Sequence, residues 1–127
     1  MITFDDLLGS PFADGGRGPS QYDCWGLCRE VYRRYGVNIP DYPISAMDAN
    51  RICKQMEQEQ HKWVQIQQPY PVPCLVAICL DSASWVNHAG VYIGNGQFIH
   101  AYRKTGVVID RIKKWRSSIV GFYVPRG

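Results

Sequence analysis

The sequence lacks a hydrophobic run that could cross a membrane. Its longest apolar run, residues 74–80, is far shorter than the roughly 20 residues that a membrane-spanning helix needs. It also lacks a long basic run of the kind that binds nucleic acid, and its net charge is only +3. Residues 1–8 contain no basic segment followed by an apolar stretch, so we expect no signal peptide and synthesis in the cytoplasm. We therefore expect no membrane span and no nucleic-acid partner.

The cysteines lack the spacing of both disulfide-rich and zinc-binding proteins. They lie at positions 24, 28, 53, 74 and 79, and an odd number without a signal peptide argues against a disulfide framework. Cys-x3-Cys and Cys-x4-Cys are not the Cys-x2-Cys pairs that are typical of structural zinc sites. We expect no metal and no cofactor, and we expect most of these thiols to lie in the core.

What the sequence does contain is a change from helical to β patterns within 127 residues, which we interpret as a single domain over residues 1–127. Apolar spacing and capping residues predict helices at residues 3–8, 24–35 and 45–60. Strands are expected at residues 72–80, 88–93, 97–102, 107–110 and 119–124, and residues 63–66 form either a strand or a segment packed over the core. Helices followed by strands predict an α+β fold with an antiparallel sheet.

The clearest of these helices begins at Cys24. Apolar residues recur from Cys24 to Tyr35 with the spacing of one helical stripe, Asp23 can cap the start, and Gly36 can end the helix. Unpaired backbone N–H groups and the helix dipole favour negative charge in the first turn, so we expect a lowered pKa for the Cys24 thiol. A cysteine on the apolar face of a helix is more often a core residue, however, and a nucleophile needs a base.

Two histidines on a predicted β-hairpin supply that base. Asn95-Gly96 is a strong turn pattern, because both residues tolerate positive φ. A turn centred there places the partner of His88 near position 102, so His100 is a diagonal neighbour on the same face of the sheet. The two imidazoles can therefore point into one cleft. We expect His88 to take the Cys24 proton and to return it to the leaving amine, while His100 orients His88.

These residues lie in motifs that resemble one protein family. The segment Asp23-Cys24-Trp25-Gly26-Leu27 is similar to the nucleophile motif of the NlpC family of papain-like cell-wall endopeptidases. The segment from His88 to Gly96 resembles the His-x-Gly-x-Tyr-x-Gly-x-Gly hairpin of that family, and Phe98-Ile99-His100-Ala101 resembles its third-residue segment. The resemblance covers residues 11–124, with the motifs in the family's order and spacing.

The resemblance implies a papain-like fold in which N-terminal helices pack on a C-terminal antiparallel sheet of about five strands. It implies a thiol protease with the triad Cys24, His88 and His100, which cleaves stem-peptide bonds of peptidoglycan next to D-glutamate and diaminopimelate without a metal. The Trp25 form of the motif and the preceding residues 15–19 resemble the branch found in phage tail-assembly proteins. Phage tail proteins are therefore expected partners, and the virion tail or delivery to the periplasm and cell wall the expected location.

Around the triad, the resemblance and the residue types suggest a substrate site. Family members often carry Tyr at the position of Phe12, where its hydroxyl helps to bind the oxyanion, so Tyr22 or a backbone N–H is expected to take that role here. Asp23 lies beside the nucleophile and is a candidate substrate contact. Trp25 and Trp85 could line a substrate groove, or they could pack in the core.

Three functions stay open at this point. The first is an active peptidoglycan endopeptidase, in a phage or prophage tail. The second is a catalytically weak module of the same fold that binds cell wall or completes a tail tip. The third is an antibacterial amidase toxin delivered to another cell. The intact Cys24, His88 and His100 favour an enzyme, whereas Phe12 argues against full activity.

Overall fold

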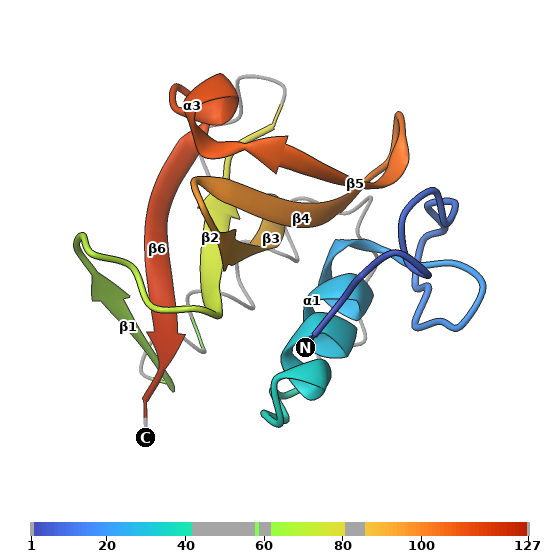
Figure 1. Cartoon of the computed structure of the whole chain (residues 1–127), viewed down its shortest axis with the longest axis horizontal. Coiled ribbons are helices and arrows are strands. Elements are labelled where there is room, and N and C mark those ends of the chain that lie inside the picture. Colours follow the sequence, from blue (N-terminus) through green and yellow to red (C-terminus); the bar gives the residue numbers. More distant parts are fainter. Residues whose placement is uncertain (1, 42–57, 59–61, 81–85, 127) are drawn as a thin grey trace.

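The structure is a computed structural model of the chain, and it describes residues 2–41, 58, 62–80 and 86–126 (Figure 1). In chain order, the elements are α1 (Cys24–Arg34), β1 (Trp63–Ile66), β2 (Cys74–Ile78), β3 (His88–Gly94), β4 (Gln97–Tyr102), β5 (Gly106–Arg111), α3 (Ile112–Trp115) and β6 (Ile119–Pro125). The strands form one sheet in the order β1-β6-β2-β3-β4-β5, and every neighbouring pair is antiparallel.

The predicted α+β fold with an antiparallel sheet is confirmed. All five expected strands form, and the sixth is β1, in the segment whose pattern was ambiguous. β1 is short and only partly buried, and it pairs along one side with β6. Because such a strand shows no clear alternation of apolar and polar residues, periodicity alone could not identify it.

Helix α1 forms where its apolar stripe predicts it. The Asp23 side chain accepts a hydrogen bond from the Gly26 backbone N–H at 2.7 Å, which caps the start. At the other end, Gly36 has a φ of 81° and follows the C-cap residue Tyr35. The helix buries its apolar face against the sheet, where it contacts β3 most and then β4.

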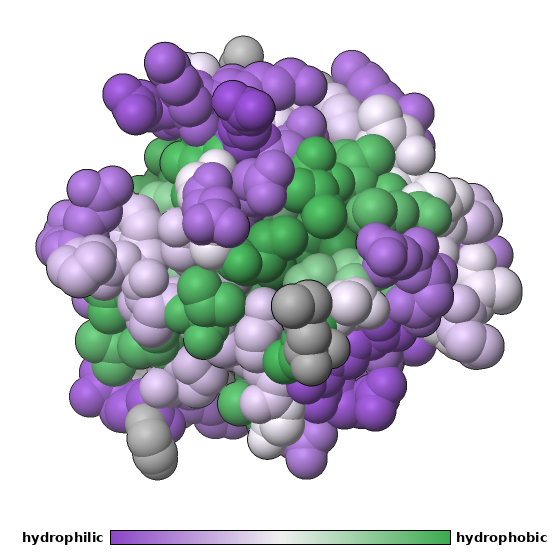
Figure 2. Space-filling model, in the orientation of Figure 1, coloured by the Kyte–Doolittle hydropathy of each residue, from purple (hydrophilic) through white to green (hydrophobic). Residues whose placement is uncertain are grey.

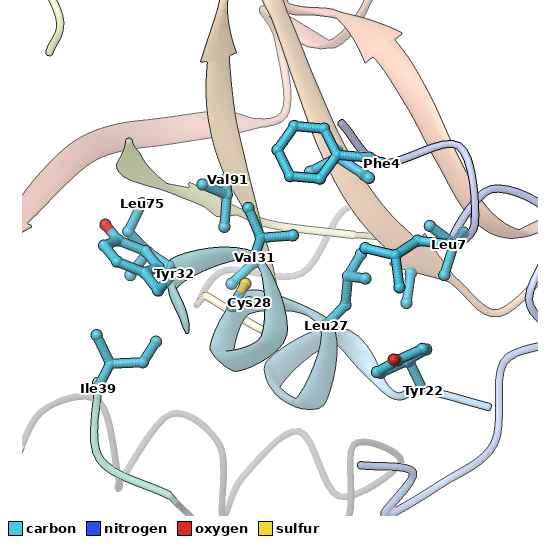
Figure 3. Packing of buried hydrophobic residues seen from close by; sticks show 14 residues of the cluster. Phe4, Leu7, Tyr22, Leu27, Cys28, Val31, Tyr32, Ile39, Leu75 and Val91 are labelled. Carbon is cyan, nitrogen blue, oxygen red and sulfur yellow. The ribbon is translucent and has the colours of Figure 1, made fainter. Parts of the chain in front are cut away.

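The core lies between that face and the sheet. Figure 3 shows Val31 of α1 directed toward Val91 of the sheet, and Leu27 of the same helix directed toward Leu7. Phe4 and Leu7, from the N-terminal segment, close the same cluster beside the helix. On the outside, Figure 2 shows hydrophobic residues gathered near the middle of one face, with hydrophilic residues around them. The helix that carries Cys24 is thus held against the two strands that carry the histidines.

The β3–β4 hairpin has the predicted register. Asn95 and Gly96 adopt φ angles of 55° and 71°, as the turn requires. Val91 pairs with Ile99 and Tyr92 with Phe98, so continuing this ladder places His88 opposite residue 102. The expected diagonal placement of His100 relative to His88 is therefore confirmed.

Two predicted helices had other outcomes, and one helix was not predicted. Residues 3–8 do not form a helix; the Phe4 carbonyl instead accepts hydrogen bonds from the Leu7 and Leu8 N–H groups in an isolated turn, because Gly9 ends the segment after one turn. The predicted helix at residues 45–60 lies outside the described residues, apart from residue 58. The short helix α3 had no counterpart in the sequence analysis.

Candidate active site

Cys24 is the first residue of α1, and its thiol lies against the start of β3. The residue is 7% exposed. The backbone N–H groups of Ala89 and Trp25 hydrogen-bond to the sulfur, and each of these contacts lowers the pKa of the thiol. Ala89 directly follows His88 on β3, so this contact places Cys24 one residue along the strand from the predicted base.

The predicted low pKa of Cys24 is wrong. Burial is the largest effect and raises the pKa of the thiol to about 12, and the negative charge of Asp23 raises it further. The two backbone N–H groups and Arg17 lower it, but they do not offset the loss of solvation. The Cys24 thiol is therefore neutral, and a neutral thiol needs a base before it can act as a nucleophile.

His88 is the predicted candidate for that base. It is 3% exposed, and burial together with the nearby His100 lowers the pKa of His88 well below its usual value. A buried imidazole with a lowered pKa stays neutral and can accept a proton. One ring nitrogen, Nε2, lies 2.8 Å from His100 Nδ1. The other nitrogen, Nδ1, takes no part in this contact.

His100 continues the array to a carboxylate that the sequence analysis did not identify. His100 Nε2 lies 2.8 Å from Asp110 Oδ2, and Asp110 belongs to β5. Burial lowers the pKa of His100, whereas the hydrogen bond and the charge of Asp110 raise it, and the net shift is downward. His88, His100 and Asp110 thus form one hydrogen-bonded row across three adjacent strands.

The signal for Asp110 was in the sequence, in the same parity rule that linked the two histidines. His100 pairs with Val108 across the β4–β5 ladder, so Asp110 is its diagonal neighbour on the same face. The sequence predicted residue 110 only as the end of a strand. The rule applies to the second hairpin only once its turn is placed, and the structure places that turn between Tyr102 and Gly106.

Aromatic rings enclose this row. Tyr102 stacks on His100 with 5.9 Å between ring centroids, and it lies 6.1 Å from the His88 ring. Trp115 of α3 meets both His100 and Tyr102 edge-on, at 5.1 and 5.4 Å. These rings restrict the rotation of His100 and exclude water from its hydrogen bonds, which strengthens them.

Asp23 has a structural role in place of the predicted substrate contact. Its Oδ1 accepts hydrogen bonds from the Gly26 N–H and from Arg17, each at 2.7 Å, and its Oδ2 accepts one from the Gly15 N–H at 3.1 Å. The residue is 1% exposed. Both oxygens are therefore engaged in joining the loop before α1 to the start of the helix.

The other predicted site residues lie near the helix start or outside the described chain. Tyr22 is buried in the core cluster with its hydroxyl beside Gly18, and Phe12 is half-buried against the same cluster. Trp25 is half-buried and its indole N–H donates to the Pro40 carbonyl at 2.8 Å. Trp85 lies outside the described residues. The substrate and oxyanion roles of these side chains stay predictions.

Two kinds of feature are absent from the described residues. Among the residues that the structure describes, no group of three or more His, Cys, Asp or Glu side chains is arranged to hold a metal ion. Neither of the described helices is long and apolar enough to cross a membrane.

Comparison with known proteins agrees with this geometry. The model of the NlpC/P60 family matches residues 9–123. The chain belongs to the NlpC/P60 family. The probable endopeptidase p60 of Listeria innocua is 30% identical over 117 residues, which are 91% of this chain and 22% of that protein. The murein DD-endopeptidase MepS/murein LD-carboxypeptidase of Escherichia coli is 24% identical over 115 residues, 90% of this chain and 54% of MepS.

Solved structures of NlpC/P60 proteins have the same fold. NlpC1 from Trichomonas vaginalis superposes with a TM-score of 0.67 at 26% identity, over 93% of this chain and 41% of that one. The NlpC/p60 domain of the peptidoglycan hydrolase SagA gives a TM-score of 0.58 at 21% identity, over 94% and 90% of the two chains. The predicted papain-like fold is thereby confirmed. This NlpC/P60 chain spans only about a fifth of the Listeria relative and about half of MepS.

Proposed function

We propose that this chain is a cysteine endopeptidase that hydrolyses stem-peptide amide bonds of peptidoglycan. The observation that carries the proposal is the placement of the Cys24 thiol at the start of α1, against Ala89 and next to the hydrogen-bonded His88–His100 pair. This arrangement supplies a nucleophile, a neutral base and a group that orients the base. The relatives named as an endopeptidase and as a murein endopeptidase support peptidoglycan as the substrate.

The reaction begins with a proton transfer from the Cys24 thiol to Nδ1 of His88, because Nε2 is turned toward His100. The sulfur attacks the scissile carbonyl carbon, and the carbonyl oxygen takes the negative charge. When the tetrahedral intermediate collapses, the C–N bond breaks and His88 gives its proton to the leaving amine. Water then attacks the thioester, again with His88 as base, and the freed thiolate recovers a proton from His88.

The oxyanion is bound at the start of the helix in this proposal. The first N–H groups of α1 have no partner within the helix, and the Cys24 N–H is one of them. A negative oxygen is also stabilised by the positive end of the helix dipole. Because Phe12 offers no hydroxyl, we assign the first donor to the Cys24 backbone.

The bond and the biological setting belong to the same proposal. The motif resemblance supports cleavage between D-glutamate and diaminopimelate. The Trp25 form of the nucleophile motif and the glycine-rich loop at residues 15–18 support a phage or prophage tail component that reaches the cell wall with the virion.

The test is digestion of purified peptidoglycan by the wild type, by Cys24→Ala and by the matched control Cys79→Ala, with products read by mass spectrometry. Cys79 is only partly buried and lies outside the described site. We expect wild type and Cys79→Ala to release the same peptides and Cys24→Ala to release none. Equal products from wild type and Cys24→Ala would reject the nucleophile, and binding without cleavage by all three would favour a cell-wall-binding module.

A further inference from the structure

We propose that Asp110 is a positioning residue of this site, which fixes the protons of both imidazoles so that His88 presents an unprotonated Nδ1 to Cys24. The inference rests on the proposed function. It concerns the carboxylate at the far end of the row, which contacts His88 only through His100 and lies on a different strand.

The hydrogen bonds along the row His88–His100–Asp110 determine which ring nitrogen of each histidine carries the proton. An ionised carboxylate can only accept hydrogen bonds, so at 2.8 Å from Asp110 the Nε2 of His100 must carry the proton. A neutral imidazole carries one ring proton, so His100 Nδ1 is an acceptor. His88 Nε2, 2.8 Å from that acceptor, must then be the donor. The only lone pair left on the His88 ring is at Nδ1.

The charge of Asp110 is maintained by its own surroundings. Burial raises the pKa of this carboxyl, but its hydrogen bond to His100 and the charges of His100 and Lys114 lower it below the usual value. The Lys114 ammonium lies 3.5 Å from Asp110 Oδ1, on the side away from His100. These partners therefore favour the ionised form of Asp110.

The side chains of the row are also held in place by their neighbours. The protonated and unprotonated nitrogens therefore keep fixed positions. No side chain stands opposite His100 on β3, because that position is Gly90, where an added Cβ would lie 3.0 Å from the His100 Cβ. Tyr102 and Trp115 cover the ring on its other sides. Within the described part of the chain, the charged or titratable groups that face the two imidazoles are Cys24 on α1, Tyr102 on β4, Asp110 on β5 and Lys114 on α3.

Without the carboxylate, both histidines can adopt the opposite tautomer. Asn at position 110 has the same shape, and its amide can accept from His100 Nε2 or donate to it. When it donates, His100 carries its proton on Nδ1 and His88 is turned into the wrong tautomer. The fraction of enzyme in that state cannot accept the Cys24 proton.

The first measurement needs no substrate. Nitrogen NMR of histidine-labelled protein reports which ring nitrogen is protonated, and His61→Gln in the background leaves only the two site histidines. At neutral pH we expect protons on Nε2 of both His88 and His100, and in Asp110→Asn a mixture that includes His100 protonated on Nδ1. Wild-type tautomers in Asp110→Asn would overturn the proposal.

The second measurement is kinetic, on a soluble stem-peptide substrate identified from the digestion products. For Asp110→Asn we expect kcat to fall on the order of 10- to 100-fold with KM unchanged, and the acid limb of the kcat profile to move to lower pH, because the imidazolium loses a stabilising negative charge. Asp110→Glu should restore part of kcat. The matched control is Asp6→Asn, whose exposed carboxylate pairs with Arg34 away from the site.

The outcomes separate this inference from the proposed function. If the wild type cleaves no peptide, the proposed function fails, and the NMR comparison still decides the role of Asp110. If the wild type is active and Asp110→Asn keeps its kcat and its acid limb, the positioning role is wrong. A parallel loss of thermal stability and of kcat without any tautomer change would show that Asp110 serves only the packing of the sheet.

Discussion

At the scale of single residues, the site is held in a neutral resting state by burial. The same desolvation that raises the pKa of Cys24 lowers the pKa of His88 and of His100. In the proposed reaction, charge appears only when the proton moves from the Cys24 sulfur to the His88 nitrogen. The row that ends at Asp110 is expected to stabilise the positive charge that then forms on His88.

Buried neutral histidines also make stability depend on pH. An imidazole whose pKa is lower in the folded than in the unfolded state contributes stability above the unfolded value of about 6.5 and loses it as the pH falls. We expect the free energy of unfolding to drop between pH 6.5 and pH 5, by about 1.4 kcal/mol per pH unit for each imidazole that stays neutral. Urea denaturation at several pH values measures this slope.

The control for that slope is the variant His88→Gln, which removes one of the two buried imidazoles. Its slope between pH 6.5 and pH 5 should be roughly half that of the wild type. The carboxyls with lowered pKa values, including Asp6 and Glu30, lose their contribution only at lower pH, so they do not affect this window. Equal slopes in both proteins would contradict the neutral state of His88.

The sequence predicted the partners of the site better than their protonation. Parity across the hairpin was enough to join His88 to His100, because side chains alternate strictly between the faces of a sheet. The predicted shift of the Cys24 pKa had the wrong direction. The effect of the helix dipole can be inferred from the position of the residue in the sequence, but the depth of its burial cannot. Asp110 was missed because its partner lies on a second hairpin, whose register depended on where the turn at residues 103–105 would fall.

At the scale of elements, the start of α1 is joined to the loop before it by a close backbone contact. A Cβ on Gly26 would clash with the Gly16 carbonyl oxygen. That same oxygen accepts hydrogen bonds from the Asp23 N–H at 3.0 Å and from Arg17 at 3.1 Å. The first turn of the helix, which carries Cys24, is therefore positioned by the loop and not by the helix alone.

We expect Gly26→Ala to displace this loop and to lower both stability and activity. The matched control is Gly36→Ala at the other end of α1, where a Cβ meets open space but the φ of 81° is unfavourable by about 1–2 kcal/mol. Thermal unfolding and peptide cleavage should both show a larger loss for Gly26→Ala. A smaller loss for Gly26→Ala than for Gly36→Ala would show that the contact with Gly16 is dispensable.

Among the elements, those with strong local patterns were predicted and those without were not. The β3–β4 hairpin and α1 follow from a turn motif and an apolar stripe. Residues 3–8 have helical spacing, but one turn gives too few hydrogen bonds to continue past Gly9. Helix α3 has only four residues, which is shorter than any window in which a helical period can be detected.

At the scale of the whole molecule, the N-terminal segment is part of the core that fixes α1 on the sheet. Leu7 is 2% exposed within the main cluster, whereas its neighbour Leu8 is 42% exposed. The Arg34 side chain of α1 also pairs with Asp6 at 2.7 Å. The segment therefore closes the end of the core beside the helix.

Two adjacent leucines allow a matched test of this arrangement. We expect Leu7→Ala to reduce the free energy of unfolding by about 2–5 kcal/mol, because it removes a buried side chain and leaves a cavity. Leu8→Ala should change it by no more than about 0.5 kcal/mol. Chemical denaturation measures both, and equal effects would contradict the burial of Leu7.

The position of β6 in the sheet has a consequence for how the protein is made. β6 lies between β1 and β2, both of which precede it in the chain, so neither can bond to its neighbour on that side until residues 119–125 have left the ribosome. During synthesis, β2 exposes the edge of a fully apolar strand, and such edges are prone to aggregation. The nascent chain therefore completes its sheet only after residues 119–125 have been made, later than every other strand.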